Sequence, residues 1–338
     1  MSEFNMQWHL TERCNLHCKH CYQETPSKEM SKEEYLHVLD QYSNLLKDVN
    51  EKLPAKQTVR GMVTVTGGEP LASPYFYDII REVKSRGYKL GVLTNGTLID
   101  DKTVKHFLTD RPDYVQVSID GDKEIHDSIR GEGNFDKAIH GLKMLVENKI
   151  PCCISFTAHK QNYKSFYRVA LAGAEIGVNY IWSDRLIPTG QGSDVEMMSD
   201  EEYQEFLRIM MTAKIELNGY IYVKMRRALQ FLVSGEPIYR CQAGRTLIVV
   251  MPDGTVYPCR RMPIPLGNLK ERSLSDLYFN HKVMKSLRDD SQCIPEKCGS
   301  CLFKNRCGGG LKCLSYALTG KINAKDKYCW LKERVDAR

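Results

Sequence analysis

The chain has 338 residues, of which 42% are hydrophobic and 27% charged, so it can bury a substantial core. No apolar run approaches the length of a membrane span, and residues 1–4 are too short and too polar for a secretory signal. The net charge of +6 comes without a dense Lys and Arg block, which argues against nucleic-acid binding and favours a solvated surface biased toward acidic partners. Thirteen cysteines in such a chain indicate metal ligation in a reducing cytoplasm.

Strand and helix signals alternate along the first 217 residues. The predicted strands span residues 5–11, 61–66, 89–94, 113–119, 151–158 and 179–184. The predicted helices span residues 31–46, 74–86, 100–108, 135–148, 165–176 and 200–217, with apolar residues at three- and four-residue steps. Six strand–helix units predict parallel strands with right-handed crossovers, and hence an α/β fold with a partial (β/α)6 barrel. Functional residues of such folds lie at the C-terminal ends of the strands.

The composition changes in the last hundred residues, which hold eight cysteines. We therefore predict two domains, a barrel over residues 1–220 and a small cysteine-rich domain over residues 221–338 that includes a linking helix. Pairs of cysteines at this spacing are also typical of zinc ribbons, so two all-cysteine zinc sites are an alternative.

Three cysteines follow the first predicted strand. Cys14, Cys18 and Cys21 have the order C-x3-C-x2-C, and three thiolates would leave one iron of a [4Fe–4S] cube open to a small molecule. From spacing alone a zinc site is equally compatible, with His17 or His20 as its fourth ligand.

A second motif, Gly67-Gly68-Glu69-Pro70, follows the second predicted strand. Two glycines let the backbone approach a ligand without a Cβ in the way, and a glutamate can accept hydrogen bonds from an ammonium group. The two motifs lie at the ends of adjacent parallel strands, so we expect them to share one site.

The order and spacing of these motifs resemble the radical S-adenosylmethionine (SAM) superfamily. The resemblance implies that the open iron chelates SAM, that reductive cleavage of SAM releases a 5′-deoxyadenosyl radical, and that the Gly-Gly-Glu segment holds the SAM amino group. It also implies that His20 stacks beside the adenine and that Tyr22 belongs to the cofactor site. A solvent-exposed loop histidine is the alternative for His20.

Other polar residues follow the later strands. By the same resemblance, Ser118 and Arg130 grip the SAM carboxylate, Asn162 reaches the ribose, Arg185 helps to close the pocket, and Asn95 lies in the same pocket. The alternatives are an ordinary turn after Ser118 and an exposed salt bridge for Arg130.

The C-terminal cysteines resemble a SPASM domain, which carries auxiliary [4Fe–4S] clusters. The resemblance implies that Cys241, Cys259 and Cys313 bind one auxiliary cluster, and that Cys298, Cys301, Cys307 and Cys329 bind a second. Five residues, three of them glycines, separate Cys307 from Cys313, where the family usually has three. Cys293 is either a further ligand of the first auxiliary cluster or a free surface thiol.

Family members mostly modify peptides or proteins. We therefore expect hydrogen abstraction from a peptide or protein side chain in the maturation of a ribosomal peptide, by cross-linking, thioether formation or a related oxidation. The expected partners are that substrate, a one-electron donor such as flavodoxin or ferredoxin, and a separate leader-binding protein. A small-molecule or cofactor-precursor substrate is one alternative, and a non-catalytic iron–sulfur electron-transfer protein is another.

Two further features bear on the chemistry. Arg260 and Arg261 follow Cys259, where sulfatase-maturing members carry an aspartate, which indicates a cationic lip for a substrate carboxylate, or ion pairs with Asp253 or Glu271. Cys152 and Cys153 face opposite sides of their strand, so one of them points into the barrel. That thiol is either a hydrogen donor to the substrate or ordinary core filler.

Overall fold

A computed structural model describes residues 2–22 and 29–331 of the chain. One curved sheet of ten strands has the order β10-β9-β8-β1-β2-β3-β4-β5-β6-β7. The strands are β1 (Ser2–His9), β2 (Val59–Thr66), β3 (Lys89–Thr94), β4 (Tyr114–Ser118), β5 (Cys152–Ala158), β6 (Tyr180–Arg185), β7 (Tyr222–Lys224), β8 (Leu247–Val250), β9 (Thr255–Tyr257) and β10 (Gly267–Asn268). Strands β1 to β7 are parallel to their neighbours, which confirms the six predicted strands and adds β7.

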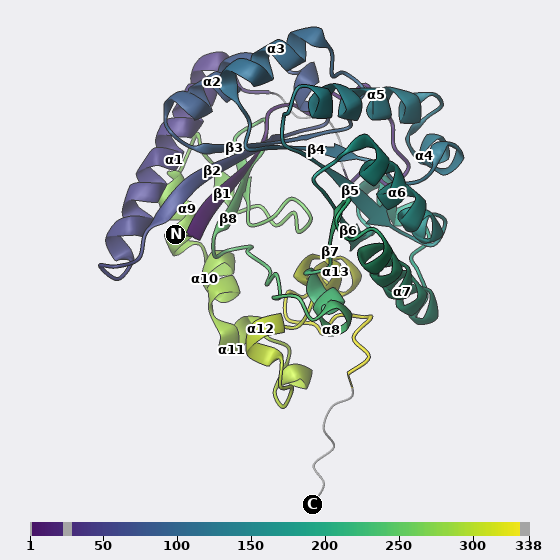
Figure 1. Ribbon diagram of the computed structural model, residues 1–338. Helices are drawn as coiled ribbons and strands as arrows, with labels where there is room; N and C mark the ends of the chain where they lie inside the picture. The colour runs from purple at the N-terminus through teal and green to yellow at the C-terminus, as the bar shows by residue number, and fades with distance from the viewer. Residues whose placement is uncertain (1, 23–28, 332–338) are drawn as a thin grey trace, which may run out of the picture.

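Helices cover the outer face of this sheet (Figure 1). They are α1 (Lys32–Lys52), α2 (Phe76–Ser85), α3 (Asp101–Asp110), α4 (Lys123–Arg130), α5 (Asn134–Glu147), α6 (Phe166–Ile176) and α7 (Asp200–Glu216). All six predicted helices are present, and α1 begins with the expected capping box of Ser31 and Glu34. Helix α4 was not predicted. Its eight residues follow the N-cap Asp122, whose side chain accepts a hydrogen bond from the backbone amide of Ile125.

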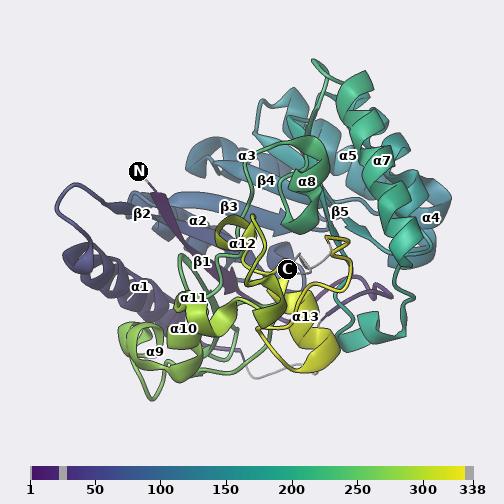
Figure 2. The same ribbon diagram turned by 90° about the horizontal axis from the view of Figure 1, so that it is seen from below.

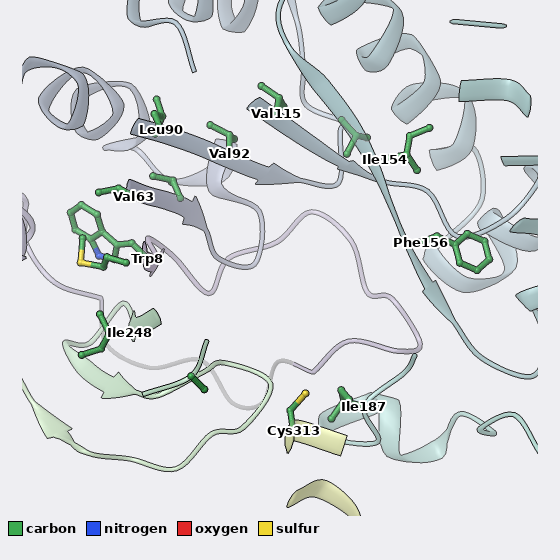
Figure 3. Packing of buried hydrophobic residues seen from close by; sticks show 14 of the residues in the cluster. Trp8, Val63, Leu90, Val92, Val115, Ile154, Phe156, Ile187, Ile248 and Cys313 are labelled. Atoms are coloured by element: carbon green, nitrogen blue, oxygen red, sulfur yellow. The ribbon is translucent and has the colours of Figure 1, made fainter. Parts of the chain in front are cut away.

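The two faces of the sheet differ in polarity because side chains alternate along each strand. Val63, Leu90, Val115 and Ile154 point toward the helices and form the core shown in Figure 3. The opposite face carries polar residues at the alternating positions. These include Asn5, Gln7, Thr64, Gln116, Ser155 and Thr157. A polar inner face leaves the interior of the partial barrel available for ligands.

The C-terminal third continues the same sheet before it folds across the open side of the barrel. Strand β8 pairs in parallel with β1, and β9 and β10 follow as antiparallel strands. Short helices also belong to this third and are seen from below in Figure 2. They are α8 (Phe231–Ser234), α9 (Leu274–Asn280), α10 (Lys282–Arg288), α11 (Asp290–Cys293), α12 (Lys304–Cys307) and α13 (Lys312–Thr319). The domain boundary near residue 220 stays a prediction, since β7 and β8 beyond it belong to the sheet.

A buried ion pair ties the last described segment to the barrel. Arg185 at the end of β6 donates from Nη1 and Nη2 to the two carboxylate oxygens of Asp326, at 2.7 and 2.8 Å. The guanidinium also lies over the rings of Tyr203 and Tyr328. Neither charged side chain is more than 3% exposed, so each depends on the other. Within residues 2–22 and 29–331, no helix is long and apolar enough to cross a bilayer.

We expect Asp326→Asn to lower the free energy of unfolding by about 3–5 kcal/mol, because it leaves the Arg185 cation buried without its counter-charge. Denaturant unfolding of the anaerobic protein measures this. The matched control is Asp136→Asn, which breaks the exposed pair with Lys123 and should cost at most about 1 kcal/mol. An equal loss of free energy of unfolding in the two variants would contradict the role given to the buried Arg185–Asp326 ion pair.

Candidate functional site

A cavity of about 440 Å³ occupies the interior of the partial barrel. Six cysteines line this central cavity, in two groups from opposite ends of the chain. Cys14, Cys18 and Cys21 form the first group, and Cys241, Cys259 and Cys313 form the second. The sequence predicts both groups, and the structure places them around one shared space.

The loop that carries the first group is held by the backbone of the next strand end. Pairing of β1 with β2 continues beyond the strands, since the amides of Gly68 and Glu69 donate to the carbonyls of Thr11 and Arg13, at 2.7 and 2.8 Å. A Cβ on Gly67 would lie 2.4 Å from the Thr11 carbonyl oxygen, and one on Gly68 would lie 2.4 Å from that of Arg13. The sequence predicted that these glycines let the backbone approach a ligand, but that is only part of their role. They line the cavity, but they also let two backbones touch.

Glu69 is fully buried and does not line the central cavity. Its carboxylate accepts hydrogen bonds from the hydroxyl of Thr94 at 2.6 Å and from the amides of Asn95 at 2.8 Å and Leu71 at 3.2 Å. Burial raises the pKa of Glu69 to about 7 despite these bonds. The carboxylate thus fixes the end of β3 and the turn at Pro70, which is buried at the start of a short 3-10 helix.

A charged network stands behind the first cysteine group. Arg130, at the end of α4, donates from Nε to Asp120 at 2.7 Å, and its Nη1 lies 3.7 Å from the sulfur of Cys18. His20 joins this network, with Nε2 3.3 Å from the same Asp120 carboxylate. Burial would raise the pKa of Asp120, but the charges of Arg130 and His20 hold it well below its usual range. Arg130 is therefore a buried, oriented cation and not an exposed surface charge.

Four of the other predicted cofactor residues line the cavity, and one does not. Ser118, Asn95, Tyr22 and Arg185 are at its wall. Asn95 Nδ2 lies 4.0 Å from the Cys14 sulfur and 3.0 Å from Oδ1 of Asn15. Asn162 is fully buried, donates to the carbonyls of Asp120 and Thr157, and is absent from the lining. Its polar groups are used to join the ends of β4 and β5.

The C-terminal cysteines lie near one another in two groups, and their assignment as cluster ligands stays a prediction. The Cys259 and Cys313 thiols lie close enough to Cys241 that, after burial, thiolate charge there raises the pKa of each. The second set, Cys298, Cys301, Cys307 and Cys329, shows the same mutual proximity. Its members do not line the central cavity.

The glycine run before Cys313 explains how the longer spacing is accommodated. Gly308, Gly309 and Gly310 have φ values of 67°, 93° and 89°, a region that L side chains rarely adopt. A Cβ on Gly310 would lie 2.3 Å from Cβ of Asp326. Cys293 is fully buried rather than a surface thiol, and its sulfur lies 3.8 Å from a carboxylate oxygen of Asp290.

The arginines after Cys259 have partners that the sequence did not indicate. Arg261 donates to the carboxylate of Asp184 at 2.7 Å, so pairing with Asp253 or Glu271 was wrong for this residue. Arg260 is 5% exposed and lies over the ring of Tyr22. Its Nε has no hydrogen-bond partner within the described part of the chain.

Sequence reasoning missed Asp184 and Arg227. Asp184 is the single carboxylate among the described residues that line the cavity, against the five arginines 130, 185, 227, 260 and 261. Burial opposes its ionisation, but Arg261 and Arg227 hold the pKa of Asp184 below its usual value. The available signal was its position at the end of β6, next to Arg185.

The two cysteines of β5 face opposite sides, as expected. Cys152 packs in the core beneath the helices. Cys153 shares the inner face with Ser155 but lies at the start of the strand and outside the cavity lining. Burial raises the pKa of the Cys153 thiol to about 12. A hydrogen-donor role for either thiol stays a prediction.

The first and second cysteine groups are suited to iron–sulfur ligation. Within the described ranges, no three His, Cys, Asp or Glu side chains converge closely enough to hold a single metal ion. A [4Fe–4S] cube instead takes each thiolate on a different iron. Half-buried sulfurs around a cavity, with Arg130 beside one of them, match a bulky anionic group of that kind.

Comparison with known families agrees with this geometry. A model of the radical SAM superfamily matches residues 8–171, and a model of the SPASM iron–sulfur cluster-binding domain matches residues 241–302. The chain is 28% identical to the AdoMet-dependent heme synthase of Methanosarcina barkeri, over 95% of both chains. It is 25% identical to the PqqA peptide cyclase of Granulibacter bethesdensis, over 95% of this chain and 86% of the cyclase.

Solved structures share the fold at low identity. SuiB of Streptococcus suis bound to S-adenosylmethionine superposes with a TM-score of 0.75 at 16% identity, over 98% of this chain and 78% of SuiB. The AdoMet-bound protein anSMEcpe superposes with a TM-score of 0.76 at 21% identity, over 96% and 94% of the two chains. The chain belongs to the radical SAM enzymes with a C-terminal SPASM domain, which use SAM, a [4Fe–4S] cluster and auxiliary iron–sulfur clusters.

Proposed function

We propose that Cys14, Cys18 and Cys21 hold the SAM-cleaving cluster and that SAM and the substrate both bind in the central cavity. The observation that carries this proposal is the convergence of two three-cysteine groups on one space of about 440 Å³. When they are bound, the cluster and SAM together supply a 5′-deoxyadenosyl radical that abstracts hydrogen. The chain's own part is to position the reacting groups and to exclude competing reactions.

Arg130 and Ser118 are proposed to receive the SAM carboxylate. Two nitrogens of Arg130 are engaged by Asp120, and Nη1 is directed toward the cysteine loop. A carboxylate next to that loop would find an oriented, charge-assisted donor. Asn95, His20 and Tyr22 complete the proposed cofactor wall, while Glu69 acts by fixing the end of β3 and the turn at Pro70.

Cys241, Cys259 and Cys313 are proposed to ligate an auxiliary cluster at the other side of the cavity. Three thiolates leave one iron without a cysteine, facing the space in which the substrate binds. The second set, Cys298, Cys301, Cys307 and Cys329, offers four thiolates away from the cavity and is proposed to hold a fully ligated cluster. Cys293, which contacts Asp290, is left outside both sets.

The charge of the cavity wall indicates a substrate that carries a carboxylate. Five arginines face one aspartate, and a [4Fe–4S]²⁺ core with three thiolates carries only about one negative charge. Arg130, Arg185 and Arg261 already have carboxylate partners. Arg260, with its unpartnered Nε, is the proposed anchor for the substrate carboxylate.

The substrate is proposed to be a peptide or protein side chain. The strands present amide and hydroxyl groups from Asn5, Gln7, Gln116, Ser155 and Thr157 to the cavity, which suits the repeated polar groups of a peptide backbone. The PqqA peptide cyclase similarity agrees with this assignment. Related heme synthases and an Fe-coproporphyrin III synthase favour a second candidate, a carboxylate-bearing cofactor precursor.

Deuterium transfer into 5′-deoxyadenosine tests the substrate. The two probes are a deuterated peptide and deuterated iron coproporphyrin III, each with reduced enzyme and SAM. Transfer from the peptide supports the first candidate, and transfer from the tetrapyrrole alone overturns it in favour of the second.

Replacing Cys18 tests the assignment of the SAM-cleaving cluster. We expect Cys18→Ala to lower the iron content from about twelve to about eight atoms per chain and to abolish dithionite-driven 5′-deoxyadenosine formation. Cys259→Ala is the matched variant, and it should lose product while retaining SAM cleavage. Normal cleavage by Cys18→Ala would refute the assignment.

Replacing Arg260 tests the carboxylate anchor. We expect Arg260→Gln to raise KM for the substrate about 10- to 100-fold, since a charge-assisted hydrogen bond is worth about 1.5–3 kcal/mol. Substrate-free SAM cleavage should not change. Arg272→Gln, which breaks an exposed pair with Asp276, is the control. An unaltered KM in the Arg260 variant would contradict the proposal that Arg260 binds the substrate carboxylate.

A further inference from the structure

The excess positive charge of the chain lies entirely at its C-terminal end. Residues 1–295 contain 38 Lys and Arg and 38 Asp and Glu, so they carry no net charge. Residues 296–338 contain 10 and 4, which accounts for the whole net charge of +6. This segment includes the second set of C-terminal cysteines.

The cations of this segment are exposed and unpaired. Lys297, Lys304, Arg306, Lys321 and Lys327 are all exposed, and none forms an ion pair with a described residue. Elsewhere on the surface, lysines such as Lys89 and Lys160 lie within 3 Å of a carboxylate oxygen. Four other charged residues lie in the described part of this segment. Glu296 is exposed, Asp326 pairs with Arg185, and the ammonium groups of Lys312 and Lys325 donate to backbone carbonyls. We name the five exposed cations the cationic face.

Apolar side chains accompany the cationic face and lie next to the cysteines. Leu302 follows Cys301 directly and is 77% exposed, and Trp330 follows Cys329 and is 38% exposed. Phe303 packs on Phe231, with ring centroids 5.5 Å apart, and so anchors the loop that presents Leu302. An apolar centre with a charged rim is typical of small, transient protein interfaces.

Residues of the cationic face alternate along the chain with the four-cysteine set. Lys297 precedes Cys298, Arg306 precedes Cys307, and Lys327 lies two residues before Cys329. These four cysteines do not line the central cavity, whereas the other two groups do. Figure 1 shows α12 and α13 on the side of the molecule away from the helices that cover the sheet.

We propose that the cationic face docks an acidic one-electron carrier protein, which reduces the cluster held by Cys298, Cys301, Cys307 and Cys329. The proposal rests on the ligand set proposed above for these cysteines. One electron leaves the carrier, one electron enters the cluster, and no bond is made or broken. Complementary charge accelerates the encounter and orients the carrier. Because the apolar centre is small, the carrier can dissociate again. A carrier bound here would contact residues that are next to the receiving cysteines in the sequence.

The test uses flavodoxin with an acidic surface and the variant Lys304→Glu/Arg306→Glu. We expect oxidised flavodoxin to bind this variant at least about tenfold more weakly at low salt, and flavodoxin hydroquinone to bleach the iron–sulfur absorbance at least about tenfold more slowly. Salt should slow the wild-type reaction. Dithionite-driven formation of 5′-deoxyadenosine should not change, because dithionite does not need the cationic face.

The control Lys137→Glu/Lys143→Glu makes the same charge change with exposed lysines of α5 and should behave as wild type. If Lys304→Glu/Arg306→Glu fails to incorporate iron, the same measurements on Lys304→Gln/Arg306→Gln test the proposal. Unchanged flavodoxin binding and bleaching, or an equal loss in the control, would overturn the proposal. RNA binding that depends on Lys304 and Arg306, with no change in flavodoxin binding or bleaching, would also overturn the proposal. Absence of SAM cleavage with dithionite in the wild type would instead refute the proposed function.

Discussion

The site depends on backbone pairing that continues past the ends of β1 and β2. The amides of Gly68 and Glu69 donate to carbonyls of the cysteine loop, and neither Gly67 nor Gly68 has room for a Cβ. The loop that carries Cys14, Cys18 and Cys21 is thereby held as an extension of the sheet. Precision in the cysteine positions comes from hydrogen bonds of the main chain, which side-chain substitution elsewhere leaves intact.

The second constraint is the attachment of the C-terminal segment across the open side of the barrel. The end of β6 provides two adjacent charged residues for this purpose. Asp184 holds Arg261, which lies beside the second cysteine group, and Arg185 holds Asp326, which lies between the last two cysteine segments. The Arg185–Asp326 pair is fully buried and the Asp184–Arg261 pair is mostly buried, so both fix orientation more than they add stability. One strand end therefore sets the relation between the barrel and both C-terminal cysteine sets.

The sequence was sufficient for the periodic features. The alternation of strands with amphipathic helices predicted β1 to β6 and their parallel order, and the resemblance to a SPASM domain implied the two C-terminal cysteine sets. Helix α4 was missed because it is short and mostly polar, with only two apolar residues, Ile125 and Ile129. The pairing of β8 with β1 was missed because it joins residues more than 240 positions apart.

The roles of individual polar residues were harder to predict, because sequence does not show which hydrogen bonds are already used. Asn162 and Glu69 stand at the expected strand ends, yet local donors and acceptors satisfy both. Arg260 and Arg261 look equivalent in sequence, but among the described residues Arg261 pairs with an acid and Arg260 does not. Such differences arise from three-dimensional neighbours.

The most direct measurement is electron–nuclear double resonance of the reduced protein with SAM labelled with ¹⁷O in its carboxylate and ¹⁵N in its amino group. The account predicts hyperfine coupling of both nuclei to the reduced cluster of Cys14, Cys18 and Cys21, and the same coupling after Cys259→Ala. Absence of coupling in the wild-type protein would contradict an iron that is open to SAM in this cavity.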